Sequence, residues 1–149
     1  MKKLYLDDLQ PGQQFTSGSY LMEENCIKAF AAEFDPQPFH LDEAAARASI
    51  FRGLCASGWH TASVAMRLLV KGGLPVADGI IGFGAEIEWP QPTRPGDVLT
   101  LHSEIVDIKP SRSKPRQGTV TVKSTMRNQS GEAVYTFTAR VLVYRRPSN

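Results

Sequence analysis

A carboxylate and an imidazole lie five residues apart in a short segment that contains two prolines. Asp35 precedes Pro36, and His40 follows Pro38. Proline fixes its own φ and drives the residue before it toward an extended conformation, so the segment cannot be helical throughout and should form a stiff loop between two helix-like runs. A carboxylate beside an imidazole can orient and deprotonate a water molecule while the imidazole handles a second proton. The pair is typical of general acid–base chemistry if it lines a pocket, and of a helix cap and a surface histidine if it does not.

Length and composition predict one compact domain over residues 1–149. The chain has 149 residues, of which 42% are hydrophobic and 21% are charged, enough for one core without a second lobe. Asp7 and Asp8 interrupt the N-terminal run before it could serve as an export signal, and no stretch approaches the ~18 apolar residues of a membrane span. Cys26 and Cys55 lack CxxC spacing. We therefore expect a cytoplasmic protein that has no disulfide and does not associate with membranes.

Hydrophobic periodicity divides the chain into a helical part and a strand-rich part. Apolar residues at helical spacing predict helices over residues 23–34, 43–49 and 58–70, with Asp42 as the N-cap of the second. Alternating apolar residues predict strands over residues 15–20, 80–89, 98–108, 119–127 and 133–144. Short breaks at 90–96, 109–118 and 128–131 imply antiparallel pairing. This order of elements predicts an α+β fold in which a sheet wraps a long central helix.

Three segments resemble the motif of the MaoC-like dehydratases, also called R-specific enoyl-CoA hydratases. They are residues 30–42 around Asp35 and His40, residues 51–59 before the central helix, and residues 92–97 before the long strands. The resemblance extends from about residue 6 to residue 144. It implies a single hotdog fold, a curved antiparallel sheet around one long helix, usually assembled as a homodimer or a higher homo-oligomer. It also implies reversible addition of water to a trans-2-enoyl-CoA, which gives a 3-hydroxyacyl-CoA.

The resemblance also assigns roles to individual residues. Asp35 and His40 would bind one water, with Asp35 as the base that orients it and His40 as the proton donor. The backbone N–H of Gly58, at the start of the central helix, would donate to the thioester oxyanion, and the missing Cβ would let the substrate approach closely. Two positions depart from the family pattern, since Gln37 replaces the usual Asn and Ser57 replaces the His of a His-Gly pair. Ser57 would either contact the substrate or cap the helix, and the cap is the simpler expectation.

Neither a resident cofactor nor a metal is expected, because coenzyme A would enter as part of the substrate. His60 and Cys55 have no oriented third partner in the sequence that would make them a nucleophile pair. His40, Asp42 and His60 lack any recognised metal-ligand spacing such as HExxH.

The segment 109–116 accounts for the net positive charge of the chain. It holds four cations and no acid, and the remaining residues have 13 basic against 15 acidic side chains. A nucleic-acid-binding protein would be basic over a whole face with interleaved aromatic residues, so no nucleic acid is expected as a partner. We predict that Arg112, Lys114 and Arg116 bind the phosphates of coenzyme A. An acidic acyl-carrier protein would suit the same charges, and a solvated loop is the plainer interpretation.

Two other functions fit the same sequence. Hotdog thioesterases generally use an acidic residue on or beside the central helix, and residues 58–70 contain neither Asp nor Glu, which weakens that alternative. A non-catalytic acyl-CoA-binding subunit would use the same groove as an enzyme, so the sequence leaves it open.

Overall fold

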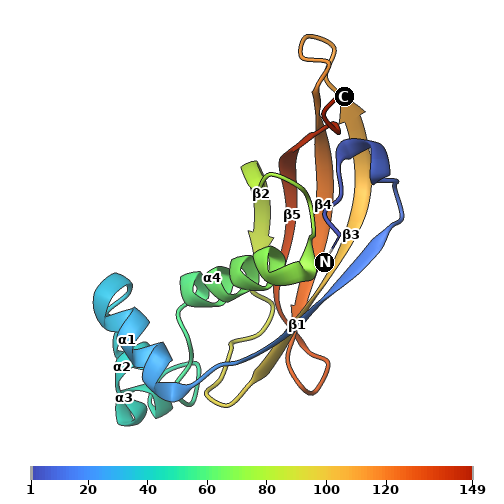
Figure 1. Cartoon of the computed structure of the whole chain (residues 1–149). Helices are drawn as coiled ribbons and strands as arrows, with labels where there is room; N and C mark the ends of the chain where they lie inside the picture. Colours follow the sequence, from blue (N-terminus) through green and yellow to red (C-terminus); the bar gives the residue numbers. More distant parts are fainter. Residues whose placement is uncertain (1, 149) are drawn as a thin grey trace.

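The computed structural model describes residues 2–148, in which a curved antiparallel sheet carries a helix on its inner face (Figure 1). The strands are β1 (Gln14–Leu21), β2 (Ile81–Glu88), β3 (Val98–Pro110), β4 (Gln117–Arg127) and β5 (Ala133–Tyr144). The helices are η1 (Leu6–Asp8), α1 (Glu24–Phe34), α2 (Pro38–Leu41), α3 (Glu43–Arg47), α4 (Gly58–Leu68) and η2 (Leu69–Gly73). The predicted α+β layout, a curved antiparallel sheet around a central helix, is confirmed.

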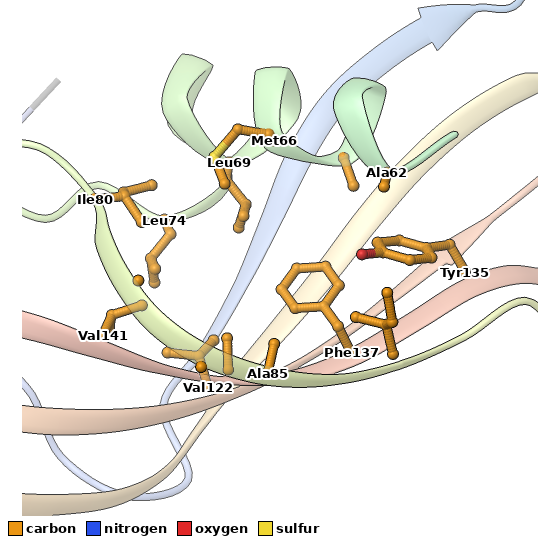
Figure 2. Close-up of a pocket in the computed structure, with 15 residues that line it drawn as sticks. Ala62, Met66, Leu69, Leu74, Ile80, Ala85, Val122, Tyr135, Phe137 and Val141 are labelled. Carbon is orange, nitrogen blue, oxygen red and sulfur yellow. The ribbon is translucent and has the colours of Figure 1, made fainter. Parts of the chain in front are cut away.

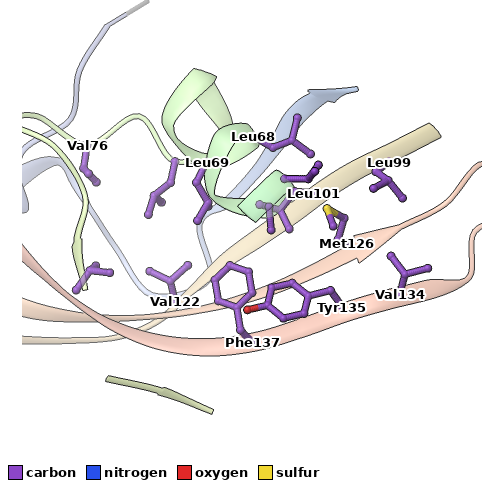
Figure 3. Packing of buried hydrophobic residues seen from close by; sticks show 14 of the residues in the cluster. Leu68, Leu69, Val76, Leu99, Leu101, Val122, Met126, Val134, Tyr135 and Phe137 are labelled. Atoms are coloured by element: carbon purple, nitrogen blue, oxygen red, sulfur yellow. The ribbon is translucent and has the colours of Figure 1, made fainter. Parts of the chain in front are cut away.

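The core lies between α4 and the inner face of the sheet because the strands alternate as their sequences predict. On β3, residues 99, 101, 103 and 105 are buried, while the alternate residues 100, 102 and 104 face outward. Figure 3 shows side chains of β3, β4 and β5 packed together with Leu68 and Leu69 at the end of α4. Burial of this apolar surface is the main stabilising term available to the fold, at about 25 cal/mol per Å².

The strand order departs from a simple meander. The sheet runs β1-β3-β4-β5-β2, with every neighbouring pair antiparallel. The two hairpins β3–β4 and β4–β5 follow the predicted breaks. In contrast, the break at 90–96 is not a hairpin, because β2 pairs with β5 and does not pair with β3. The segment 89–97 therefore crosses the end of the sheet, and part of it forms one wall of the cavity described below.

The central helix ends earlier than residue 70. α4 ends at Leu68, and one π-type turn, η2, follows it directly. Gly72 in this turn has φ 129°. That backbone conformation favours glycine. An added Cβ at the next residue, Gly73, would lie 2.7 Å from the Leu68 carbonyl oxygen. The Gly72-Gly73 pair thus ends the helix as predicted, over a slightly shorter length.

No helix within residues 2–148 is long and apolar enough to cross a membrane. Cys26 and Cys55 are both free thiols, and Cys55 is buried.

Candidate active site

Asp35 and His40 contact each other directly. His40 Nε2 lies 3.3 Å from Asp35 Oδ2, and the two side chains are 6% and 19% exposed. Asp35 is the C-cap of α1, and His40 lies in the short helix α2, whose first residue is Pro38. The sequence predicted a loop at His40, but proline is well tolerated at the first position of a helix and starts α2 there. The single helical turn brings the imidazole back against the carboxylate.

The backbone of Cys55 fixes the imidazole of His40. His40 Nδ1 lies 2.6 Å from the Cys55 carbonyl oxygen. A carbonyl oxygen only accepts, so Nδ1 carries a hydrogen and donates. The Nε2 atom therefore faces Asp35 with a lone pair in the neutral imidazole, or with a second hydrogen in the imidazolium. This arrangement leaves Nε2 as the proton-transferring atom.

The carboxylate of Asp35 has its own hydrogen-bond donors. Gln37 Nε2 donates to Asp35 Oδ1 at 2.6 Å, which leaves Oδ2 for His40. Partial burial alone would raise the pKa of the Asp35 carboxyl, but hydrogen bonds from Ser57 and Gln37 and the nearby charge of protonated His40 outweigh it and lower the pKa. Asp35 therefore stays ionised and can accept a proton.

Arg94, which sequence reasoning gave no role, holds the loop that positions His40. Its guanidinium donates to the carbonyl oxygens of Phe51 and Gly53, the latter at 2.8 Å, and more weakly to that of Leu54 at 3.4 Å. Next along the chain is Cys55, whose carbonyl orients His40. The turn 92–97 was noted for its motif, but no sequence signal shows that one arginine ties it to three carbonyl groups 40 residues away.

The pair lines a cavity of about 530 Å³, here called the Asp–His cavity. Its walls come from the α2 region, from residues 55–61 and from the crossing segment 89–93. Ala56 N–H donates to the Thr93 carbonyl oxygen at 2.9 Å, and Thr61 Oγ1 donates to Thr93 Oγ1 at 3.1 Å. These bonds hold the 89–97 segment on its crossing path. If β2 and β3 were joined by a hairpin, Thr93 would not reach this side of the cavity.

Gly58 begins α4 and lines the Asp–His cavity. A first-turn N–H has no acceptor within its own helix, and no backbone acceptor for it occurs among residues 2–148. The structure shows one contact that requires glycine here. An added Cβ would lie 2.8 Å from Trp89 Cε2, and Trp89 Nε1 donates to the Gly58 carbonyl oxygen at 2.9 Å. The missing Cβ therefore accommodates an indole, where the sequence suggested that it makes room for the substrate.

Ser57 is fully buried and acts as the N-cap of α4. Its Oγ accepts from the Trp59 N–H at 3.3 Å. It is 0% exposed and does not line the Asp–His cavity, so its geometry favours the cap over the predicted substrate contact.

The basic side chains lie far from Asp35 and His40. Arg112, Lys114 and Arg116 occupy the β3–β4 hairpin, at the end of the sheet opposite α1, α2 and α3 (Figure 1). β3 separates them from the 92–97 turn by 13 residues, or about 40 Å of strand. Within one chain, the structure does not bring these cations to the Asp–His cavity.

Other combinations of reactive side chains do not form a site. His60 is buried and stacks on Phe30, with ring centroids 4.7 Å apart, and burial lowers its pKa. Asp42 caps α3 by accepting from the Ala45 N–H at 3.2 Å, as predicted. Among residues 2–148, no three His, Cys, Asp or Glu side chains cluster as metal ligands would.

A second, apolar cavity of about 300 Å³ lies between α4 and strands β2 and β5 (Figure 2). We call it the α4–β2 cavity. Aromatic rings connect it to the Asp–His cavity, because Trp89 lines the first cavity and lies 5.7 Å from the ring of Tyr135, which lines the second. The structure places Met66 in the α4–β2 cavity and both tryptophans in the Asp–His cavity.

The sheet, the helix on its inner face and the rim position of the Asp–His pair together define a hotdog-fold protein. The model of the MaoC-like domain matches residues 8–128, and the chain therefore belongs to the MaoC-like dehydratase family. The crystal structure of a MaoC-like dehydratase from Rhodospirillum rubrum is 56% identical, with a TM-score of 0.96 over 97% of this chain and 99% of that one.

Two further relatives span nearly the whole chain. The uncharacterized protein YdeM of Bacillus subtilis (strain 168) is 34% identical over 141 residues, covering 94% of this chain and 99% of its own. The (R)-hydratase from A. caviae involved in PHA biosynthesis is 27% identical, with a TM-score of 0.69 over 93% of this chain and 98% of that one. The relatives support hydratase or dehydratase chemistry for this family.

Replacing Gln37 with Leu should shift the acid limit of activity. The hydrogen bond from Gln37 helps to lower the pKa of Asp35, so its loss raises that pKa, and less of the carboxylate remains ionised at a given acidic pH. The acid limb of the kcat/KM profile should therefore move to higher pH, with kcat at neutral pH falling by at most about tenfold. The exposed Gln10→Leu serves as the matched control, and an unmoved acid limb would contradict the role of Gln37.

Replacing Gly58 with Ala should destabilise the protein through Trp89. The new Cβ overlaps the indole, and such overpacking typically costs about 1–3 kcal/mol. In a Trp89→Leu background the same change should cost much less, giving a coupling free energy measurable by chemical denaturation. Gly18→Ala is the matched control, since a Cβ there meets nothing within 4 Å. If the free-energy costs of the two substitutions are additive, Gly58 is not required to make room for the Trp89 indole.

Proposed function

We propose that this protein reversibly adds water to a trans-2-enoyl-CoA to give a 3-hydroxyacyl-CoA. The observation that carries the proposal is the 3.3 Å contact between Asp35 and an imidazole whose other nitrogen is tied to the Cys55 carbonyl, inside a cavity large enough for a substrate. An ionised carboxylate and a proton-carrying Nε2 on the same wall are what addition of water across a polarised double bond requires.

The proton transfers balance over one cycle. The water oxygen bonds to C3 of the enoyl group and gives its proton to Asp35, while the π electrons of the double bond move toward the thioester. His40 then donates the proton on Nε2 to C2, which completes the 3-hydroxyacyl product. Both side chains are now neutral, and the direct contact lets Asp35 return its proton to His40 Nε2.

The thioester oxygen gains charge when C3 is attacked. The Gly58 N–H lies at the positive end of α4 and has no internal acceptor, so it is the donor we assign to that oxygen. One preorganised donor of this kind is worth about 3 kcal/mol of barrier.

We further propose that the protein works as a homodimer or a higher homo-oligomer. β2 is an edge strand that carries the exposed side chains Ile81 and Phe83, and a separate exposed apolar stripe lies on α4 and η2. That stripe consists of Trp59, Met66 and Val70. Antiparallel pairing of two β2 strands would continue the sheet and cover these side chains. It would also set the β3–β4 hairpin of one copy at the same end as the Asp–His cavity of the other.

The substrate form and location follow from the same proposal. A hairpin supplied by a second copy would let Arg112, Lys114 and Arg116 bind coenzyme A phosphates, or an acidic acyl-carrier protein, without any resident cofactor. Acyl thioesters of this kind belong to fatty acid metabolism. The free thiols of Cys26 and Cys55 suit the reducing cytoplasm in which we place the protein.

The first test follows enoyl-thioester absorbance and free thiol in parallel, with short and medium trans-2-enoyl-CoA esters. Asp35→Asn and His40→Ala should each lower kcat by at least about a hundredfold with little loss of binding, because proton transfer contributes that much. Asp42→Asn is the control for Asp35, since Asn caps a helix equally well. The outward-facing His102→Ala is the control for His40.

The two readouts separate the alternatives. Loss of absorbance without thiol release, abolished in both site variants, supports a hydratase. Thiol release without hydration would identify a thioesterase, and tight binding with neither signal would identify a non-catalytic acyl-CoA-binding subunit.

The oligomer and the basic hairpin are tested together. Phe83→Lys should yield a monomer by light scattering, whereas Val106→Lys, equally exposed on β3, should not. Reversing the charges of Arg112 and Lys114 to Glu should raise KM for the CoA substrate roughly tenfold in the oligomer. If the hairpin acts only across copies, the same reversal should change nothing further in a Phe83→Lys monomer that keeps some activity. An unchanged KM in the oligomer would contradict phosphate binding.

A further inference from the structure

The lining of the α4–β2 cavity contains one side-chain hydroxyl. Its walls are otherwise aliphatic or aromatic, from α4, η2 and the strands β2, β4 and β5. They include Ala62, Met66, Leu69, Ile80, Phe137 and Val141. Figure 2 shows the Tyr135 hydroxyl as the single oxygen among the drawn side chains, directed toward Phe137 and the middle of the cavity.

The Tyr135 side chain is largely buried, and its hydroxyl faces the cavity (Figure 2). Tyr135 is 6% exposed, and its ring is held between Trp89 at 5.7 Å and Phe137 at 5.3 Å. Throughout residues 2–148, no side chain or backbone group bonds to its Oη, and the oxygen is not among the fully buried atoms that lack a partner, so it remains open to the cavity. Burial raises the pKa of Tyr135, so the group remains a phenol with a hydrogen to donate.

The Tyr135 hydroxyl becomes a buried, unpaired group when an apolar ligand fills the cavity, and that state is unfavourable. Buried polar groups are nearly always hydrogen-bonded, and exceptions usually have a specific cause. For a purely hydrocarbon ligand, phenylalanine would serve better at this position, because the ligand would displace any water from the hydroxyl and give nothing back. A ligand with an oxygen atom next to the Tyr135 hydroxyl would accept its hydrogen bond.

The cavity lies where an acyl chain from the Asp–His cavity would pass. Gly58, Ala62 and Met66 follow one another at four-residue spacing along α4, so a chain whose thioester sits at Gly58 reaches Ala62 after one turn, about 6 Å. Trp89 and Tyr135 lie side by side at the junction of the two cavities. Tyr135 is therefore encountered part-way along the chain, beyond the reacting carbons.

We propose that the α4–β2 cavity selects acyl chains that carry one oxygen acceptor, such as a hydroxyl, carbonyl or ether oxygen, at the depth of the Tyr135 hydroxyl. The inference rests on the proposed function, because the Asp–His cavity must hold the thioester. Tyr135 acts in it as a specificity-determining residue that takes no part in the proton transfers.

The test measures equilibrium binding of saturated acyl-CoA thioesters, which cannot be hydrated. All have the same chain length, and a single ether oxygen is moved one position at a time along the chain. In the wild-type protein one member should bind about tenfold more tightly than the all-carbon chain, which corresponds to one recovered hydrogen bond. In Tyr135→Phe that advantage should vanish, while the all-carbon chain binds equally well or better.

Tyr144→Phe is the matched control, since Tyr144 lies on β5 outside both cavities and the wild-type profile should persist there. Tyr135→Phe should unfold at the same denaturant concentration as the wild type, because no protein hydrogen bond is lost. A flat oxygen profile in the wild type, or a peak that survives in Tyr135→Phe, would overturn the proposal. A third outcome is an affinity peak that Tyr135→Phe removes, in a protein that hydrates no enoyl thioester. That outcome would contradict the proposed hydratase function and support the selectivity of the cavity.

Discussion

The hydrogen bond from His40 Nδ1 to the Cys55 carbonyl oxygen is the constraint on which the site depends. It determines which imidazole nitrogen faces Asp35, and so which atom can move a proton. The acceptor is a backbone group, so its position depends on the path of the chain and cannot be restored by another side chain. Arg94 secures that path by donating to three carbonyl groups just before Cys55. A guanidinium suits this task because its planar fork offers five donors in fixed directions.

The unusual strand order serves the same constraint. Because β2 pairs with β5 at one edge, the chain must cross the end of the sheet to begin β3. The crossing segment brings Thr93 and Arg94 against residues 51–56 and Trp89 against Gly58. A direct β2–β3 hairpin would preserve the core but remove one wall of the cavity. Residues 89–97 therefore join the topology of the sheet to the wall of the Asp–His cavity, while the long strands contribute mainly to the buried core.

Periodicity predicted the regular elements well. The strands of the second half and the cap of α3 by Asp42 were readable because alternation and capping are local properties. The strand order and the helical turn at His40 were not readable. Strand order depends on contacts between distant segments, and α2 is so short that only its proline marks it. At the site, residue types and spacing singled out Asp35 and His40, and the family resemblance favoured their pairing, which the structure shows as a direct contact. The supporting Arg94 and Trp89 could not, because each contacts backbone that lies far away in sequence.

The Asp–His pair lies at the end of the sheet for a physical reason. In the central strands β3, β4 and β5 the backbone carbonyls are largely taken up by the two neighbouring strands, and the carbonyls within α4 are committed to its own turns. Only irregular backbone such as residues 51–56 offers a free carbonyl in a protected place, and such backbone must be held by donors from elsewhere. The core can then remain apolar under α4. This division also makes an unpartnered hydroxyl at Tyr135 informative, because nothing in the folding of an apolar layer requires it there.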